Sequence, residues 1–386
     1  MIFSLEALQA FQGDCLLLHA GSATQPLLVL IDGGPSSTWE TSLRPRLEQL
    51  RGERAGDEAG AALSIDLAMV SHIDDDHIHG MLDFAGELVT EQLDARPLSY
   101  EVQTLWHNAF DDVVDDADAL RSAAVDVLSQ PVGDPRADEI RAAGLAIVAS
   151  VNQGRELRDQ AARLGWSVND PFDGPVVLPP DGRRAITLGD VTLTVVCPHA
   201  TQLEKLHEAW DTWLRQHPHA IKDPAATAAF VDRSPYNLSS IVVLAECAGK
   251  RMLLTGDARG DHVLSGLDAA GIAEQGATHV DILKLPHHGS IRNLAEEFFA
   301  RITADHYVIS ANGRHGNPET ETLELIAASR SDDDFEIHLT NRAGSGDLEQ
   351  RMEQFLAARD AAGRTYRVSF RDEDALSLRI DLLEEG

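Results

Sequence analysis

The residues best suited to chemistry lie in one short motif, His72-x-Asp74-x-Asp76-His77, which follows the apolar run Ile65–Val70. Side chains at the carboxyl end of a strand, and in the loop after it, can turn toward a single point. Imidazole and carboxylate are the ligands of zinc and neighbouring divalent ions. His72 and Asp74 could serve one ion, and Asp76 and His77 a second, as in the two-ion clamps that hydrolyse esters in line. The alternative is an acidic, solvated loop with incidental histidines.

Two later segments end apolar runs in the same residue types. Asp257 follows the run Met252–Leu254, where an aspartate is well placed to bridge two cations, with turn capping as its alternative role. The run Asp281–Leu285 is followed by His287 and His288. We expect only one of these two histidines to face the metals, because successive residues leaving a strand point to opposite sides. Three strand ends of this kind together predict a metal site.

Alternating strands and helices must position these segments. The second of two N-terminal strands ends at Asp32, before Gly33 and Gly34. Apolar runs predict strands at Cys15–His19, Pro26–Ile31, Ile65–Val70, Val191–Cys197, Ser240–Glu246, Arg251–Thr255, Asp281–Leu285 and His306–Ser310. Helical spacing predicts helices at Trp39–Leu50, Leu294–Ile302 and Glu319–Ala328. This alternation indicates an α/β architecture.

Two stretches are predicted to depart from that alternation. Residues 83–184 are rich in Ala, Asp, Glu and Arg, with helical spacing at Asp116–Leu128 and Glu139–Ser150 and a strand near Val102–Trp106. We expect a largely helical insertion or cover within a single domain of 1–386, and it could dock a protein partner. The terminal stretch Arg371–Gly386 alternates apolar and polar residues and is predicted to form an edge strand.

Composition narrows the class of protein. The 386 residues are 43% hydrophobic and 25% charged, which is ordinary for a globular protein. Lys and Arg number 32 and Asp and Glu 63, a net charge of −31 that disfavours extended binding to duplex nucleic acid. No apolar run approaches the roughly 20 residues that cross a bilayer, and no signal peptide is recognised. Three dispersed cysteines favour a reducing cytosol, so we expect a cytoplasmic protein without a membrane partner.

Four segments in this order, SHIDDDHIHG, LLTGDA, LKLPHHGS and ISANGRHGNP, resemble the metallo-β-lactamase superfamily. The resemblance is closest to the hydrolase domain of the ComEC competence proteins and to their soluble stand-alone relatives. That group shares the aspartate at Asp74 and an Asn-x-x-Ser strand entry, which Asn237 to Ser240 matches. The resemblance covers about Leu5 to Ile326, and it is specific for the fold but only weakly specific for the substrate.

The resemblance implies a four-layer αβ/βα sandwich with two divalent ions, zinc or manganese, at one edge. Asp257 would be the bridging carboxylate, and one histidine of the later pair, with His288 favoured slightly over His287, would complete a metal shell. The ligands implied in the first motif are His72, Asp74, Asp76 and His77.

This chain departs from the family pattern at several positions. Asn317 stands where the relatives usually have the histidine of a Gly-His-Pro, and His315 is the candidate to replace it. His79 stands where a second glycine is common, and it is either a group near the metals or substrate or a solvated residue. His199 follows a strand, where many members of the superfamily have a further ligand. Asp32 is either a partner that holds a ligand histidine or only a turn residue.

These observations predict a dinuclear metal hydrolase that attacks an ester through a metal-bridging hydroxide. Asp76 and Asp74 are the candidates for accepting a proton from the nucleophilic water. The ComEC resemblance favours a phosphodiester, in nucleic acid or a small nucleotide. One alternative is a hydrolase of a lactone, thioester or amide on the same fold, because fold does not fix substrate. Another is a weakly active or non-catalytic module that binds a partner.

Overall fold

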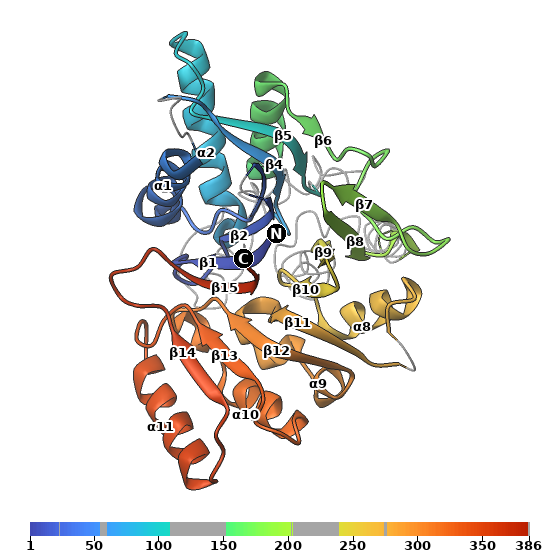
Figure 1. Ribbon diagram of the computed structural model, residues 1–386, viewed down its shortest axis with the longest axis vertical. Helices are drawn as coiled ribbons and strands as arrows, with labels where there is room; N and C mark the ends of the chain where they lie inside the picture. The colour runs from blue at the N-terminus through green and yellow to red at the C-terminus, as the bar shows by residue number, and fades with distance from the viewer. Residues whose placement is uncertain are drawn as a thin grey trace, which may run out of the picture.

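Two β-sheets form the centre of the protein (Figure 1). The computed structural model describes residues 1–22, 24–54, 60–108, 152–201, 203, 239–273 and 276–384. The first sheet has the order β15-β1-β2-β3-β4-β5-β6, and the second has the order β14-β13-β12-β11-β10-β9-β8-β7.

The first sheet contains β1 (Ile2–Leu8), β2 (Leu16–Ser22), β3 (Gln25–Ile31), β4 (Leu63–Met69), β5 (Tyr100–Trp106), β6 (Ser167–Val168) and β15 (Ser377–Leu383). The second contains β7 (Ala185–Leu188), β8 (Val191–Cys197), β9 (Val242–Cys247), β10 (Lys250–Leu254), β11 (Thr278–Lys284), β12 (Ile302–Ile309), β13 (Glu336–Leu339) and β14 (Arg367–Phe370). The principal helices are α1 (Arg44–Arg54), α2 (Asp75–Leu93), α8 (Gly260–Ala269), α9 (Glu296–Arg301), α10 (Thr320–Ser329) and α11 (Leu348–Ala361).

Three separate apolar clusters define four layers. One cluster joins the first sheet to α1 and α2. A second joins the other sheet to α8, α9, α10 and α11. The third lies between the two sheets. Strand β3 shows how one strand contributes to two layers of core. Leu28 and Leu30 on one face belong to the outer cluster, while Val29 and Ile31 on the other face belong to the inner one. Both faces of the strand are buried, so its residues are continuously apolar.

The predicted four-layer αβ/βα sandwich is therefore confirmed, and it is the architecture that the resemblance to the metallo-β-lactamase superfamily implied. The predicted C-terminal edge strand is confirmed as well, since β15 pairs antiparallel with β1 at the end of the first sheet. The helix predicted at Trp39–Leu50 forms as a π-type turn, Trp39–Leu43, followed by α1. Pro45 follows this turn directly, within continuous helical backbone, and because it has no N–H it donates no helical hydrogen bond there.

The stretch 83–184 is described only in part. Strand β5 forms where a strand was predicted, and it pairs with β4 inside the first sheet. A helix over residues 152–164 follows, and Leu157 and Ala161 from it are buried in the outer cluster of the first sheet. The helices predicted at Asp116–Leu128 and Glu139–Ser150 lie outside the described residues. The insertion, and its docking of a partner, therefore stay predictions.

Strand direction brings the chemical segments together. Strands β3, β4 and β5 run parallel, as do β10, β11 and β12. The carboxyl ends of parallel strands meet at one edge of a sheet, which is where open α/β sheets bind ligands. The ends of β4, β10 and β11 carry the three predicted metal-type segments.

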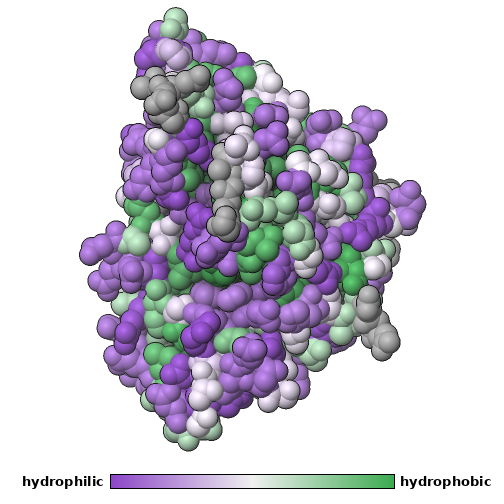
Figure 2. All heavy atoms as spheres, viewed as in Figure 1, coloured by the Kyte–Doolittle hydropathy of each residue, from purple (hydrophilic) through white to green (hydrophobic). Residues whose placement is uncertain are grey.

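Charge and polarity dominate the surface. Figure 2 shows hydrophilic residues over most of one face. Among the described residues, the large hydrophobic side chains that are exposed are Met1 and Leu93. In the same part of the chain, no helix has both the length and the apolar content that spanning a bilayer requires.

A buried ion pair at Glu6 of β1 contributes to the stability of the first sheet, and this contribution can be measured. Glu6 is 1% exposed and accepts hydrogen bonds from Arg46 Nε (2.6 Å), from His19 Nε2 (2.8 Å) and from Ser377. Burial would raise the pKa of Glu6, but His19, Arg46 and Ser377 outweigh burial and lower it to about 2. The stabilisation from ionised Glu6 is therefore complete above the unfolded pKa of 4.5 and is lost as pH falls from there toward 2.

We expect Glu6→Gln to lower the free energy of unfolding by about 3 kcal/mol at pH 7, because the pKa difference of Glu6 corresponds to that energy. The difference from the unsubstituted protein should shrink as the pH falls below about 4.5. Urea unfolding at a series of pH values measures both effects. A difference that stays constant with pH would contradict the assignment.

Candidate metal centre

The predicted metal-type residues converge at the edge where both sheets end. His72 follows β4, and Asp76 and His77 lie in the first turn of α2 rather than in a loop. Asp257 follows β10, and the pair His287 and His288 follows β11. Each side chain thus comes from the carboxyl end of a buried strand or from the helix directly after it.

Asp257 stands at the centre of the cluster, and its two carboxylate oxygens face different histidines. Asp257 Oδ1 lies 3.3 Å from His77 Nε2 and 3.5 Å from His288 Nε2. Asp257 Oδ2 lies 3.9 Å from His72 Nε2 and 3.7 Å from His287 Nε2. Ligands 2.0–2.2 Å from one tetrahedral ion are about 3.3–3.6 Å apart. The separations at Oδ1 therefore fit a shared ion, and those at Oδ2 are slightly wider.

The donor atoms at this centre are buried but make no hydrogen bonds. This holds for the Nε2 atoms of His72, His77 and His288 and for Oδ1 of Asp257. A buried polar atom without a hydrogen bond costs about 1–3 kcal/mol, so four at one point call for a ligand that satisfies them together. The donor set, imidazole nitrogens around a carboxylate, is the one that zinc and manganese accept. The residues present therefore fit a divalent metal centre.

Asp32 orients His77. Its Oδ2 lies 2.8 Å from His77 Nδ1, while the backbone N–H and the hydroxyl of Ser71 donate to its two oxygens at 2.6 and 2.7 Å. A carboxylate only accepts, so His77 Nδ1 carries the proton and donates it. Once an ion displaces the second proton of the ring, the lone pair lies on Nε2, which faces Asp257. Of the two roles considered for Asp32, the structure favours that of the partner that holds a ligand histidine.

His288 is oriented by a similar pair of acceptors. Its Nδ1 donates to the backbone carbonyl of Ser310 at 3.0 Å and lies 3.4 Å from Asp14 Oδ1. Asp14 is fully buried and forms an ion pair of 2.5 Å with Lys284, which is also fully buried. Sequence reasoning did not identify Asp14 or Lys284 as part of the site. A lysine inside an apolar strand needs a buried acid, and that requirement was the signal available.

Asp74 and Asp76 border the cluster on its open side. Asp74 Oδ2 lies 3.5 Å from His72 Nε2, and Asp76 Oδ2 lies 3.5 Å from His288 Nε2. Their side chains are 38% and 29% exposed, against 5% for Asp257. Asp74 is the N-cap residue of α2, so both acids stand near the positive end of the helix dipole.

Both histidines of the later pair approach Asp257, although only one was expected to do so. The expectation assumed extended backbone, but His287 and His288 have φ values of 49° and 55°. Two consecutive residues in the left-handed region curl the chain, so strand alternation no longer separates the two rings. His288 is 3% exposed, and His287, whose side chain is 33% exposed, faces the open side.

Asn317 and three histidines that were candidate ligands lie outside the cluster around Asp257. Asn317 donates from Nδ2 to the backbone carbonyl of His287 at 3.4 Å, so it supports the chain beneath a ring instead of facing the centre. His315 is exposed on the turn Arg314–Gly316. His79 pairs with Asp75 on the outer side of α2 at 2.8 Å. His199 is half-buried after β8. Among the described residues, none of the three histidines His79, His199 and His315 belongs to a group of His, Cys, Asp and Glu side chains that could hold a metal.

Neighbouring charges set the ionisation of the cluster. Burial opposes charge on His77 and His288, but Asp257 and the acids Asp32 and Asp14 outweigh it. They raise the pKa of His77 well above its usual value and the pKa of His288 to about 10. For the acids the balance is reversed: burial alone would raise their pKa values, but the neighbouring histidines have the larger effect. They lower the pKa of Asp76 to about 2 and the pKa of Asp257 well below its usual value.

No protein-family model matches the sequence, and no curated protein sequence matches it. Among solved structures, the crystal structure of zinc-bound PqqB from Methylobacterium extorquens is similar to this chain. The two are 10% identical, the match covers 98% of this chain and 100% of that one, and the TM-score is 0.40. A similarity of this size supports no conclusion about this chain. The fold is defined by the four layers described above, and the site is defined by the distances between its side chains.

The first prediction for the centre concerns Asp32. In Asp32→Asn the amide can still accept from Ser71, but the group beside His77 Nδ1 becomes a donor. The ring proton must then move to Nε2, which blocks the ligand atom. We expect the dissociation constant for Zn²⁺ to rise about 10–100-fold. Asp75→Asn, which removes the same charge from an outward-facing acid, should leave it unchanged. Equal losses in both variants would show that only net charge matters.

The second prediction concerns pH. Because the raised pKa values of His77 and His288 keep both rings protonated at neutral pH, an ion must displace those protons. We expect Zn²⁺ binding near pH 7 to release about one to two protons and to weaken as the pH falls. Calorimetry in buffers of different ionisation enthalpy counts these protons. Binding with no proton release would contradict the assignment.

Proposed function

We propose that this protein is a dinuclear metal-dependent hydrolase that acts on phosphodiesters. Asp257 carries the proposal, because its two oxygens are faced by two separate pairs of imidazole nitrogens. One set would comprise His77, His288 and Asp76 around Oδ1. The other would comprise His72, His287 and Asp74 around Oδ2. A carboxylate that faces two donor sets in this way is suited to bridging two ions.

The chemistry that a pair of divalent ions supplies is acidification of water and stabilisation of negative charge on oxygen. The residues of the chain do the rest. Asp32, Ser310 and Asp14 hold the two buried rings in one tautomer and one orientation. Asp74 and Asp76 are the partly exposed acids beside the donor atoms. The carboxylate of either residue can take a proton from a water molecule that approaches from the open side.

Two observations support an anionic ester as the substrate. The net charge of −31 would repel a phosphodiester, but two bound cations reverse the field locally. Near the centre, Arg259 and Arg292 line a cavity of about 240 Å³ together with Asn293. Asn293 donates from Nδ2 to the backbone carbonyl of Asp257 at 3.2 Å, which places this cavity beside the centre. Arg259 is held by Asp261 of the same lining at 2.8 and 3.0 Å, so Arg292 is the arginine best placed to pair with phosphate oxygens. Because the positive field of two ions is local, it favours a short or single-stranded substrate over a long duplex.

Activity on a bis-aryl phosphodiester tests the proposal. With Zn²⁺ or Mn²⁺ present, we expect the protein to hydrolyse it, and Asp257→Asn to lower kcat by about 100-fold or more, because the bridging charge is lost. Asp268→Asn is the matched control. It removes one carboxylate charge from α8, where Asp268 is 50% exposed and pairs with Arg301. Its kcat should not change.

Three outcomes would contradict the proposal. Turnover of a lactone or thioester without phosphodiester turnover would assign the same centre to another class of ester. Full phosphodiester turnover in Asp257→Asn would separate the activity from this cluster. A protein that binds metal but hydrolyses none of these esters would favour a module that binds a partner.

A further inference from the structure

A second group of metal-type residues lies on the second sheet, away from Asp257. His306 on β12 and Glu336 and His338 on β13 offer ligand atoms within 4.8 Å of one another. His306 on β12 precedes Ser310, the residue just after the strand, by four residues, and Ser310 contacts the first centre. At about 3.3 Å per residue, this places His306 roughly 13 Å from that end of the strand. The two clusters are therefore separate.

Strand register gathers these side chains on one face. His306 is paired with Glu336, and Glu336 with Arg367 of β14. His338 follows Glu336 by two residues and is paired with Ser369. The residues between them, among them Tyr307 and Ile337, belong to the apolar cluster on the other face. Register and alternation thus fix the two histidines and the acid together, independently of any loop.

The two imidazoles are close to ligand spacing. His306 Nδ1 lies 3.0 Å from His338 Nε2, so the two nitrogens need to separate by only about 0.3–0.6 Å to reach the spacing of ligands around a tetrahedral ion. Ser369 Oγ lies 2.8 Å from His338 Nδ1, where it can accept the ring proton and leave the lone pair on Nε2. A ligand histidine with such a partner on its far nitrogen is the usual arrangement in metal sites.

Glu336 supplies the third ligand. Arg367 occupies Glu336 Oε2 at 2.7 and 2.8 Å, while Oε1 lies on the side of His338, 3.8 Å from its Nδ1. Arg367 therefore fixes the carboxylate through Oε2, and Ser369 also hydrogen-bonds Glu336, so an ion would bind through Oε1 in place of other contacts there.

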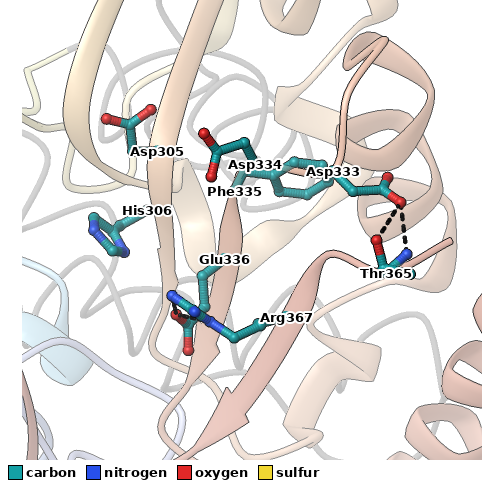
Figure 3. Close-up of a pocket in the computed structure, with 8 residues that line it drawn as sticks. All are labelled: Asp305, His306, Asp333, Asp334, Phe335, Glu336, Thr365 and Arg367. Carbon is teal, nitrogen blue, oxygen red and sulfur yellow. Dashed lines mark hydrogen bonds and ion pairs between the residues drawn. The ribbon is translucent and has the colours of Figure 1, made fainter.

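Two of the three residues, His306 and Glu336, line a cavity of about 360 Å³ (Figure 3). Asp305, Asp333 and Asp334 line it together with His306 and Glu336, and Arg367 is the cation in the lining. The figure shows Arg367 reaching across to Glu336 and Asp333 bound to Thr365. The acids outnumber the base, so the cavity attracts cations and admits the water that would complete an ion's coordination.

We propose that His306 Nδ1, His338 Nε2 and Glu336 Oε1 form a second binding site for a zinc-type divalent ion, distinct from the Asp257 centre. On binding, the hydrogen bond between the two rings is replaced by two metal–nitrogen bonds. The proton on His306 Nδ1 moves to its Nε2, so the neutral ring need not lose a proton. Two imidazoles and a carboxylate with an open position suit zinc.

Zinc content after equilibrium dialysis tests this site in the full-length chain. We expect His306→Gln to bind one equivalent less Zn²⁺ than the unsubstituted protein, with affinity for that equivalent reduced about tenfold or more. His279→Gln is the matched control, since His279 lies on the neighbouring strand β11, is 52% exposed and pairs with Asp305 at 3.2 Å. Its zinc content should be unchanged, and circular dichroism should show both variants folded.

A second measurement does not depend on a variant folding. Diethyl pyrocarbonate modifies free imidazole, and mass spectrometry of the unsubstituted protein reports the modification of His306. Zinc should slow that modification about tenfold, while His279 stays equally reactive. Equal zinc content in His306→Gln and the unsubstituted protein would overturn the proposal, because the two rings would then be only a hydrogen-bonded pair. Modification of His306 that is independent of zinc would overturn it as well.

Discussion

The carboxylate of Asp257, almost fully buried among imidazoles that it does not hydrogen-bond, is the constraint around which the rest of this structure is arranged. Burying these imidazole nitrogens and the carboxylate away from water is unfavourable unless a bound ligand interacts with all of them. The fold supplies the convergence, because the carboxyl ends of parallel strands from two sheets meet at this edge. It also supplies the partners on the far side of each buried ring, so that the atoms left without hydrogen bonds all face one another.

Close backbone contacts make the convergence possible. A side chain at Gly256 would meet Ser71 at 2.7 Å, and one at Gly13 would meet the backbone carbonyl of Asp76 at 1.9 Å. Glycine at these two positions lets the segments that carry Asp257 and Asp14 approach the segment that carries the first motif. The buried pair of Asp14 and Lys284 then ties the loop before β2 to the end of β11. Removing either partner would leave a buried charge uncompensated, so this pair stabilises the position of His288 only as a unit.

Much of this could be predicted from the sequence where local pattern determines structure. The apolar runs marked most strands of both sheets, and the residue types at strand ends marked His72, His77 and Asp257. The first motif was expected in a loop, yet α2 begins within it, because Asp74 can cap a helix as easily as it can follow a strand. The pair His287 and His288 was misjudged because left-handed backbone at two non-glycine residues leaves no mark in composition. Contacts between distant segments, such as Lys284 with Asp14 or His306 with His338, depend on strand order and register, which one sequence does not state.

The most direct test of the central claim is anomalous diffraction from crystals of the unsubstituted protein equilibrated with Zn²⁺. The account predicts two anomalous peaks at the Asp257 cluster, one within about 2.0–2.2 Å of each carboxylate oxygen of Asp257. One peak should be shared with His77 and His288, and the other with His72. Crystals in which no peak lies within bonding distance of Asp257, although zinc binds elsewhere on the chain, would contradict it.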